Sequence, residues 1–454
     1  MKITKMALSA ALAATCLSGS IFAQTDATSS DYGYYASDAA PVASSASLSD
    51  YTPASAADYS AVVPAAAQCG CTDTPVSDCC DISCNTCCDD GGCDSACGGG
   101  GGLLAGLFGG DGIDVGGWAQ IGYHSANNAL FNRHADNVNL HQAWLYAEKV
   151  ADGSSGIGLG GRIDYVYGVD AQDTQAFGNQ AASHWDNSWD NGIYGHAIPQ
   201  LYAEVAAGDL SVKVGHFYTL IGYEVVGATG NFFYSHSHTM YNSEPFTHTG
   251  ALAQYAAGDG LTLYGGYVLG WDSGFRDNGD AFLGGYSADI TDTTNITNQV
   301  IIGNFGKGGA DETGFMSSFI ATTDLTDAVQ HVFWVDILDT DHGNGNAVQR
   351  ETIDVNNYLL VTLADNLVWG NRFEWYNVDT GVYGIGGPGK SDFYAYTSGL
   401  NVSLAENLMI RPEVRWDWNI DRIANVGGGP PATAPTENGR ASQTTFGMDG
   451  IISF

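Results

Sequence analysis

Basic residues are scarce in this chain. Its 454 residues include 15 lysines and arginines against 50 aspartates and glutamates, which gives a formal net charge of −35. Because such a surface repels polyphosphates and anionic headgroups, the charge balance argues against nucleic acid and anionic lipid headgroups as partners. On its own, the acid excess indicates no more than colloidal solubility.

Long apolar runs are missing as well. After the first 23 residues, no stretch approaches the ~18 consecutive apolar residues of a membrane-spanning helix. Long segments with a helical period of 3.6 residues are absent too. Prolines number only 11, whereas there are 61 glycines, 24 tyrosines, 18 phenylalanines and 10 tryptophans. This composition favours many strands and tight turns over helices.

No catalytic motif stands out. The chain has no G-x-S-x-G, no H-E-x-x-H and no phosphate-cradling loop followed by a helix. The carboxylates Glu374 and Glu413 could be assigned acid–base roles, but no nucleophile is paired with them. The sequence therefore predicts a protein that is not an enzyme and needs no cofactor.

Residues 1–23 have the pattern of a secretory signal. A short basic start precedes an apolar stretch, and the small-residue exit GSIFA predicts cleavage after Ala23. Cys16 lies inside the apolar stretch, but Thr15 before it fits a lipoprotein signal poorly. We therefore expect export without lipidation.

Two unusual segments follow the signal. Residues 24–68 are rich in Ala, Ser, Asp and Tyr without a basic residue, which predicts a disordered acidic spacer. Residues 69–102 combine nine cysteines with a glycine run at 98–102. In an exported protein this density favours disulfides over metal, because no histidine is interleaved and adjacent cysteines do not match zinc-finger spacing. The disulfide candidates are Cys69, Cys71, Cys79, Cys80, Cys84, Cys87, Cys88, Cys93 and Cys97. Since nine is odd, one thiol remains or pairs with another molecule, and a disulfide-linked envelope partner is a hypothesis.

The remaining chain, 113–454, consists of sixteen strand-like segments. Each is close to the ~9–11 residues that a tilted membrane strand requires. We expect strands at 113–123, 139–149, 157–168, 197–207, 210–218, 249–257, 260–270, 281–290, 297–304, 314–322, 327–336, 353–364, 366–377, 391–404, 407–417 and 442–454. Short turns alternate strictly with long polar loops, which is typical of outer-membrane barrels with short periplasmic turns and long extracellular loops. The predicted fold class is all-β, a transmembrane antiparallel β-barrel of about sixteen strands.

The run MIRPEVRWDWNI (409–420) distinguishes a membrane barrel from a soluble sandwich. Its charged residues alternate with apolar and aromatic ones, so one face of the strand is ionised and the other apolar. Arginines facing lipid would cost ~2–4 kcal/mol each at midplane depth, so the charged face meets water and the aromatic face meets lipid. The pore-lining candidates are Arg162, Asp164, Arg372, Glu374, Arg411, Glu413, Arg415 and Asp417. Candidates for an aromatic girdle are Trp375, Trp416 and Trp418.

The carboxy-terminal strand, TTFGMDGIISF, ends on an aromatic residue, Phe454. This ending resembles the signal by which the barrel-insertion machinery recognises outer-membrane barrels. The long motifs are LHQAWLYAEK (140–149), GRIDYVYGVDAQDTQAFG (161–178), IPQLYAEVA (198–206), the run from VKVGHFYTLIGYE to GALAQY (212–255), RFEWY (372–376) and RPEVRWDW (411–418). Over roughly 113–454 these segments resemble the OmpL-like beta-barrel porin-2 family, planctomycete-type outer-membrane porins. The resemblance implies an outer-membrane channel and does not cover the cysteine-rich segment.

The third long loop, 219–248, is unusually apolar for a surface loop. We expect it to fold into the lumen, because a barrel of ~16 strands is wide enough to leave an aqueous channel. The constriction-loop candidates are Glu224, His236, His238 and Glu244. Projecting across the pore toward wall arginines, they would set a transverse field that filters small polar solutes. Alternatively, the arginines only pair with wall acids to satisfy buried charge.

The H-x-H pair in this loop raises the question of a metal. In an extended segment, His236 and His238 would point both rings the same way, and His216 and His248 flank the loop. Loops rich in tyrosine and histidine are nonetheless common without metal, so we predict no metal site.

Three functions remain open from the sequence. The first is a porin for passive diffusion of small polar solutes and ions, with a cation-leaning passage. The second is a substrate-selective channel with a sugar- or ion-binding ladder. The third is a structural anchor that holds the cysteine-rich segment in the envelope. The expected partners are outer-membrane lipid, small solutes and the insertion machinery. A homotrimer is expected only from other sixteen-stranded porins.

Overall fold

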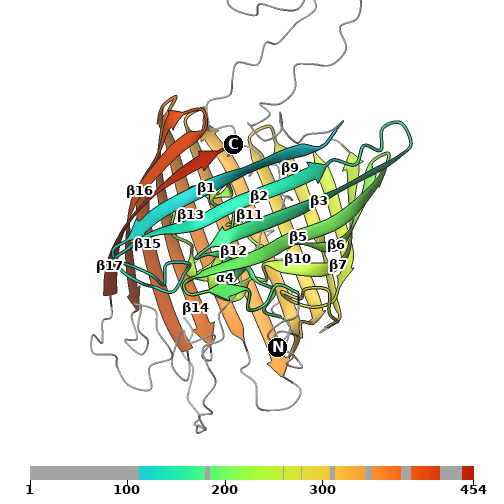
Figure 1. Ribbon diagram of the computed structural model, residues 1–454, viewed down its shortest axis with the longest axis horizontal. Helices are drawn as coiled ribbons and strands as arrows, with labels where there is room; N and C mark the ends of the chain where they lie inside the picture. Colours follow the sequence, from blue (N-terminus) through green and yellow to red (C-terminus); the bar gives the residue numbers. More distant parts are fainter. Residues whose placement is uncertain are drawn as a thin grey trace, which may run out of the picture.

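The computed structural model describes residues 112–178, 185–258, 260–277, 279–306, 312–342, 350–379, 390–419 and 442–454. In these parts, sixteen long strands form one antiparallel sheet, and the sheet closes where β1 (Asp114–His124) pairs with β17 (Ser442–Ser453). Successive long strands are neighbours throughout, so the barrel runs up and down. Figure 1 shows the strands tilted around a common axis, with the carboxy-terminus at the upper rim. The predicted sixteen-stranded antiparallel barrel is confirmed.

The other long strands follow in chain order. They are β2 (Val138–Lys149), β3 (Ile157–Gly168), β5 (Tyr194–Ala207), β6 (Leu210–Tyr218), β7 (Thr247–Gly258), β8 (Leu261–Val268), β9 (Ala281–Thr291), β10 (Thr294–Asn304), β11 (Glu312–Thr326), β12 (Val329–His342), β13 (Glu351–Ala364), β14 (Leu367–Asp379), β15 (Lys390–Ala405) and β16 (Leu408–Asn419). Each contains the core of one predicted segment. The predicted signal, spacer and cysteine-rich segment (1–23, 24–68 and 69–102) lie outside the described residues.

The long loops contain short elements that the sequence analysis did not anticipate. These are helix α4 (Ala171–Thr174), the two-residue strand β4 (Asp190–Asn191), the 3₁₀ turn η2 (Ala228–Gly230) and helix α5 (His238–Ser243). Each is too short for a sequence period of 3.6 residues to be visible. Among the residues described, no helix is both long and apolar enough to cross a lipid bilayer.

Strand β16 shows how the sequence alternation becomes two faces. Arg411 and Arg415 are at most 2% exposed on the inner face, whereas Trp416 between the charges is 39% exposed on the outside. The same alternation in β14 buries Arg372 and exposes Phe373. Because successive side chains point to opposite faces, one register places Arg372 and Glu374 of β14 and the four charges of β16 inside.

The connections alternate in length around the barrel. For example, residues 208–209 join β5 to β6 and residues 365–366 join β13 to β14, while 219–246 separate β6 from β7. The short connections share one rim with the start of β1 and the end of β17. At that rim Phe454 closes the barrel, because its backbone exchanges hydrogen bonds of 2.9 and 3.0 Å with Gly117.

The segment 219–246, called the inner loop below, packs inside the barrel. Its buried side chains, among them Phe232 and Met240, form one apolar cluster with wall residues such as Trp334. Fully burying one such side chain contributes ~1.5–3 kcal/mol, so the cluster can hold a loop that has little regular structure. At Gly370, a Cβ would lie 2.1 Å from the Phe232 ring, so only glycine admits this close approach.

Candidate functional site

Arg372, on the inner face of β14, binds the inner loop directly. Its guanidinium contacts the Glu224 carboxylate and donates to the Ser235 carbonyl oxygen at 2.8 Å. Glu224 also accepts from the Tyr358 hydroxyl at 2.7 Å and from the Ser237 amide at 2.7 Å. Although burial alone would raise the pKa of Glu224, the facing Arg372 charge brings that pKa below its usual value. The wall and the loop therefore share a fully buried ion pair.

Arg411, on the inner face of β16, holds the start of the same loop. It donates to the carbonyl oxygens of Ala228 at 2.9 Å and Asn231 at 2.6 Å. On its other side, its Nε donates to Asp449 of β17 at 3.0 Å. This arginine thus links two strands to the turn η2.

Two wall carboxylates bind the amide groups of the inner loop. Glu374 accepts from the His238 amide at 3.0 Å and from the Thr239 amide at 2.8 Å, at the start of α5. Glu413 accepts from the Tyr234 amide at 3.0 Å. At the start of α5 the carboxylate of Glu374 is favoured, because the first amide groups of a helix have no partner within the helix.

The two histidines of the H-x-H pair point to different neighbours. His238 begins α5, and its Nε2 lies 3.2 Å from Asp417. The His236 ring packs on Phe131 with 4.7 Å between centroids. Between them, Ser237 caps the helix by accepting from the Met240 amide. The two rings are therefore not arranged as in an extended segment, because the chain turns into a helix between them.

The inner loop carries its titratable groups toward the wall and not across a passage. Glu224, His236, His238 and Glu244 are all buried, at most 6% exposed. The expectation that they face wall arginines across open water is wrong for Glu224, because it contacts Arg372 directly. Arg415 likewise donates to the His236 carbonyl oxygen and pairs with Asp417 at 2.7 Å. Of the two interpretations of these charges, the contacts favour pairing.

Glu244 lies in a cluster of buried acids. Asp336 of β12 and Asp354 of β13 are direct cross-strand partners on the inner face, and Glu244 approaches them from the loop. Within the described residues, no N–H or hydroxyl group donates to either Glu244 carboxyl oxygen. Burial first, and the facing acids Asp336, Glu224 and Asp354 next, raise the pKa of Glu244 well above its usual value. A proton on this carboxyl removes the repulsion that three ionised groups would impose.

Another part of the inner wall, on β2, β3, β5 and β6, carries a more accessible set of charges. Arg162 of β3 pairs with Glu148 of β2 at 3.0 Å, and these side chains are 11% and 25% exposed. Arg162 also donates to Asp164 at 2.6 Å. Further along, Glu204 of β5 stands opposite Lys213 of β6 in register. Acids and bases thus alternate around this part of the lumen.

The three predicted girdle tryptophans share the other side of the sheet. Trp416 stacks on Tyr396 and Trp418 on Tyr394, each with 5.6 Å between ring centroids. Trp375 donates from its indole N–H to Asp392 at 2.7 Å. Rings with one polar edge suit a membrane–water interface.

The arrangement of possible metal ligands is known only for the described parts of the chain. There, no three His, Cys, Asp or Glu side chains are arranged to hold a metal ion. His248, for example, bonds the Gly270 carbonyl oxygen at 2.9 Å and the Thr219 hydroxyl at 3.0 Å. The disulfide candidates Cys69–Cys97 lie outside these parts.

Several inner charges escaped the sequence analysis. These are Glu148, Glu204, Lys213, Asp336 and Asp354. Their strands alternate as β16 does, so an inward position could have been assigned from FWVDIL (333–338) or TIDVN (352–356). The hydrogen-bond and ion-pair partners of each charge could not be assigned from the sequence.

Comparison with known proteins agrees with this architecture. The family described as "beta-barrel porin-2, OmpL-like" matches residues 112–454. The chain belongs to this family. The porin also superposes on an anion-selective porin from Comamonas acidovorans, with a TM-score of 0.51 and 12% identity, covering 75% of this chain and 99% of that chain. OmpT of Vibrio cholerae, in its trimer form, superposes with a TM-score of 0.51 and 11% identity, covering 75% of this chain and 99% of that chain.

No curated protein matches the porin by sequence. At 11–12% identity, the two solved structures show the fold alone. Family membership makes the porin an outer-membrane β-barrel channel, and it indicates a channel more than an enzyme.

Proposed function

We propose that the porin lets small polar solutes and ions diffuse passively across the outer membrane, past the inner loop. The observation that carries this proposal is the uneven use of the inner wall. Arg372 and Arg415 are fully buried under the loop, whereas the Arg162–Glu148 pair on β2 and β3 keeps contact with water. The route runs along the second side, where alternating acids and bases can stabilise a hydrated ion.

The passage leans toward cations. Acids outnumber bases 50 to 15 in the whole chain, and Glu148 and Glu204 contribute acids to the accessible part of the wall. A pore lined by an excess of acids concentrates cations and repels anions. The Comamonas porin is anion-selective by its own description, so the shared fold does not decide the sign.

Export and assembly belong to the same proposal. Cleavage after Ala23 releases the mature chain, which inserts with its short turns in the periplasm and its long loops outside. The trimer form of OmpT supports a homotrimer for this chain as well. Amino-terminal sequencing of the mature protein and its mass in detergent check both points; a mature chain that keeps Met1, or a monomeric mass, would contradict them.

Planar-bilayer recording tests the diffusion function. Purified protein should give ohmic conductance that scales with salt concentration, and a salt gradient should give a reversal potential toward the cation value. The Glu148→Gln variant should conduct with weaker cation preference, because one accessible acid is lost. A bilayer that stays silent at all voltages would reject the proposal.

A further inference from the structure

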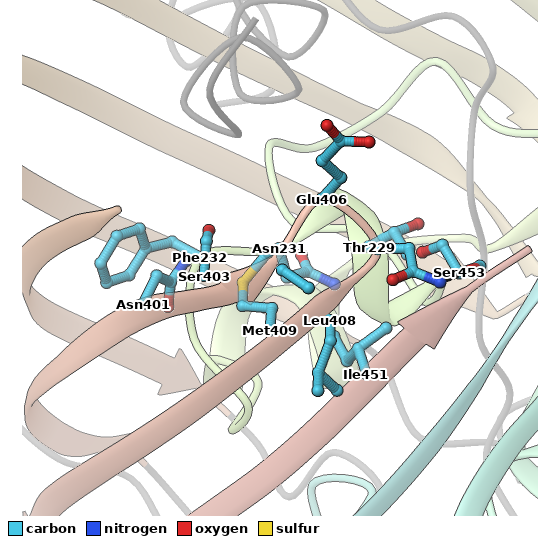
Figure 2. Close-up of a pocket in the computed structure, with 12 residues that line it drawn as sticks. Thr229, Asn231, Phe232, Asn401, Ser403, Glu406, Leu408, Met409, Ile451 and Ser453 are labelled. Carbon is cyan, nitrogen blue, oxygen red and sulfur yellow. Dashed lines mark hydrogen bonds between the residues drawn. The ribbon is translucent and has the colours of Figure 1, made fainter. Parts of the chain in front are cut away.

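A cavity of about 330 Å³ lies at the short-turn rim, away from the arginine contacts described above. It lies between the η2 end of the inner loop and the inner face of β15, β16 and β17 and is open on one side. Figure 2 shows Phe232 beside Asn401 and Ser403 at one end, and Thr229 beside Ser453 at the other. Its volume falls at the lower end of the ~300–1,000 Å³ of small-molecule sites.

The chemistry of this cavity is neutral and mixed. Hydroxyl and amide groups come from Ser403, Thr229 and Asn401, and apolar surface comes from Phe232 and Met409. No lysine, arginine or histidine is among the described residues that line it. The single acid there is the exposed Glu406 of the β15–β16 turn, which points away from the other side chains in Figure 2. Such a lining does not compensate an ionic ligand.

Asn401 gives the clearest sign of a missing partner. Its Oδ1 is buried and has no hydrogen-bond partner among the described residues. A buried amide oxygen without a donor is destabilising unless a ligand or water supplies the hydrogen. Asn401 lines the cavity, so a rotation of its amide would bring this oxygen to a donor bound there.

The apolar end of the cavity is held in place. Phe232 is 6% exposed and packs edge-on against Phe233 with 4.9 Å between centroids. Its ring also fits closely over Gly370. A fixed ring beside hydroxyl and amide groups suits a solute that has both C–H and O–H surface.

We propose that this cavity is a binding site for a neutral, hydroxyl-rich solute of the size of a mono- or disaccharide. The C–H face of a sugar ring lies against Phe232 and Met409, and its hydroxyl groups donate to Asn401 and bond Ser403. The inference rests on the proposed diffusion function, because the site lies at one mouth of the lumen. Affinity is weak, since a solute that is to leave again must not be held tightly.

Maltose is the probe for this site. Added to single channels in a planar bilayer, it should reduce the current in a saturable way, with half-block in the millimolar range. Asn401→Ala should raise the half-blocking concentration about 3- to 10-fold, because one hydrogen bond is lost. Ser403→Phe, which fills the cavity, should abolish the block.

A matched control lies at the same rim on the other side of the barrel. Asn295 of β10 is an inward-facing asparagine that does not line the cavity, so Asn295→Ala should leave the block unchanged. Equal block in the parent, Asn401→Ala and Ser403→Phe proteins would overturn the inference while conductance itself stays intact.

A second measurement keeps the two proposals separate. Saturation-transfer NMR of maltose with the purified porin in detergent reports binding without any current. Signal transfer that Ser403→Phe removes supports the site even if the bilayer is silent, and a silent bilayer rejects only the diffusion function. No transfer to the parent protein overturns the site.

Discussion

The two sides of the inner wall carry similar charges and use them differently. On the β14–β16 side, Arg372 and Arg415 are fully buried and bind the inner loop. On the β2–β3 side, Arg162 and Glu148 form a pair that remains partly exposed. The difference teaches that an inward charge on a barrel strand does not by itself mark a pore-lining residue. It can equally be an anchor for whatever fills the barrel.

The two environments imply different energies. Breaking a buried pair by removing one partner costs about 3–5 kcal/mol, because a charge is left without compensation. An accessible pair contributes only about 0–1 kcal/mol. Substitutions of the same type on the two sides should therefore separate anchoring from conduction.

The largest effect is expected from Glu224→Gln. This change removes the charge that faces Arg372 inside the protein, so the inner loop should detach from the wall and the free energy of unfolding should fall by about 3–5 kcal/mol. Single channels should show larger and noisier conductance, and denaturant titration in detergent should show a lower midpoint.

The same substitution on the other side is the control. Glu148→Gln should change the unfolding midpoint little, within about 1 kcal/mol, and leave the conductance quiet. If Glu148→Gln destabilised the protein as much as Glu224→Gln, the distinction between the two sides would be wrong.

A smaller effect is expected from pH. The folded-state pKa of Glu244 is raised by burial among Glu224, Asp336 and Asp354, with Glu374, Tyr376 and Arg350 beyond them. The folded protein binds this proton more tightly than the unfolded chain does. The contribution of Glu244 to the free energy of unfolding is therefore complete below the unfolded-state pKa of 4.5, and it is lost as pH rises through the folded-state pKa. The loss is at most about 1.4 kcal/mol per pH unit in that window.

Thermal unfolding between pH 5 and 8 measures this loss. Glu244→Gln should flatten the decline with rising pH, whereas Glu406→Gln, at an exposed turn, should follow the parent protein. His236 acts in the opposite sense, because burial lowers its pKa to about 4, so stability also falls as pH drops below 6.5. A parent profile without any decline above pH 5 would contradict the acid cluster.

The smallest effect is expected on the outer face. Trp416→Ala removes a ring that stacks on Tyr396, which should cost about 0.5–1.5 kcal/mol beyond lost apolar area. Conductance should not change, because neither ring faces the lumen. Urea unfolding of the protein folded into lipid vesicles measures the cost, and a changed single-channel current would show that the assignment of faces is wrong.

Much of the fold could be predicted from local patterns. The alternation in β14 and β16 assigns the inner and outer faces of the sheet. The lengths of the strand-like segments predict the number of strands, and the alternation of short turns with long loops predicts which rim carries the turns. The placement of the 219–248 loop inside the barrel also followed from its apolar composition. The short helix α5 could not be predicted, because six residues are too few for a helical period to be detected. The geometry of His236 and His238 was missed for the same reason.

The candidate site divides along the same line. By itself, the sequence determined which side chains face inward, since side-chain direction in a strand depends only on parity along the chain. Only the tertiary structure decided which inward charges remain in contact with water and which are buried under the loop. Arg372 and Glu224 are 148 residues apart in sequence, so their contact depends on how one loop packs against one wall and not on any local pattern.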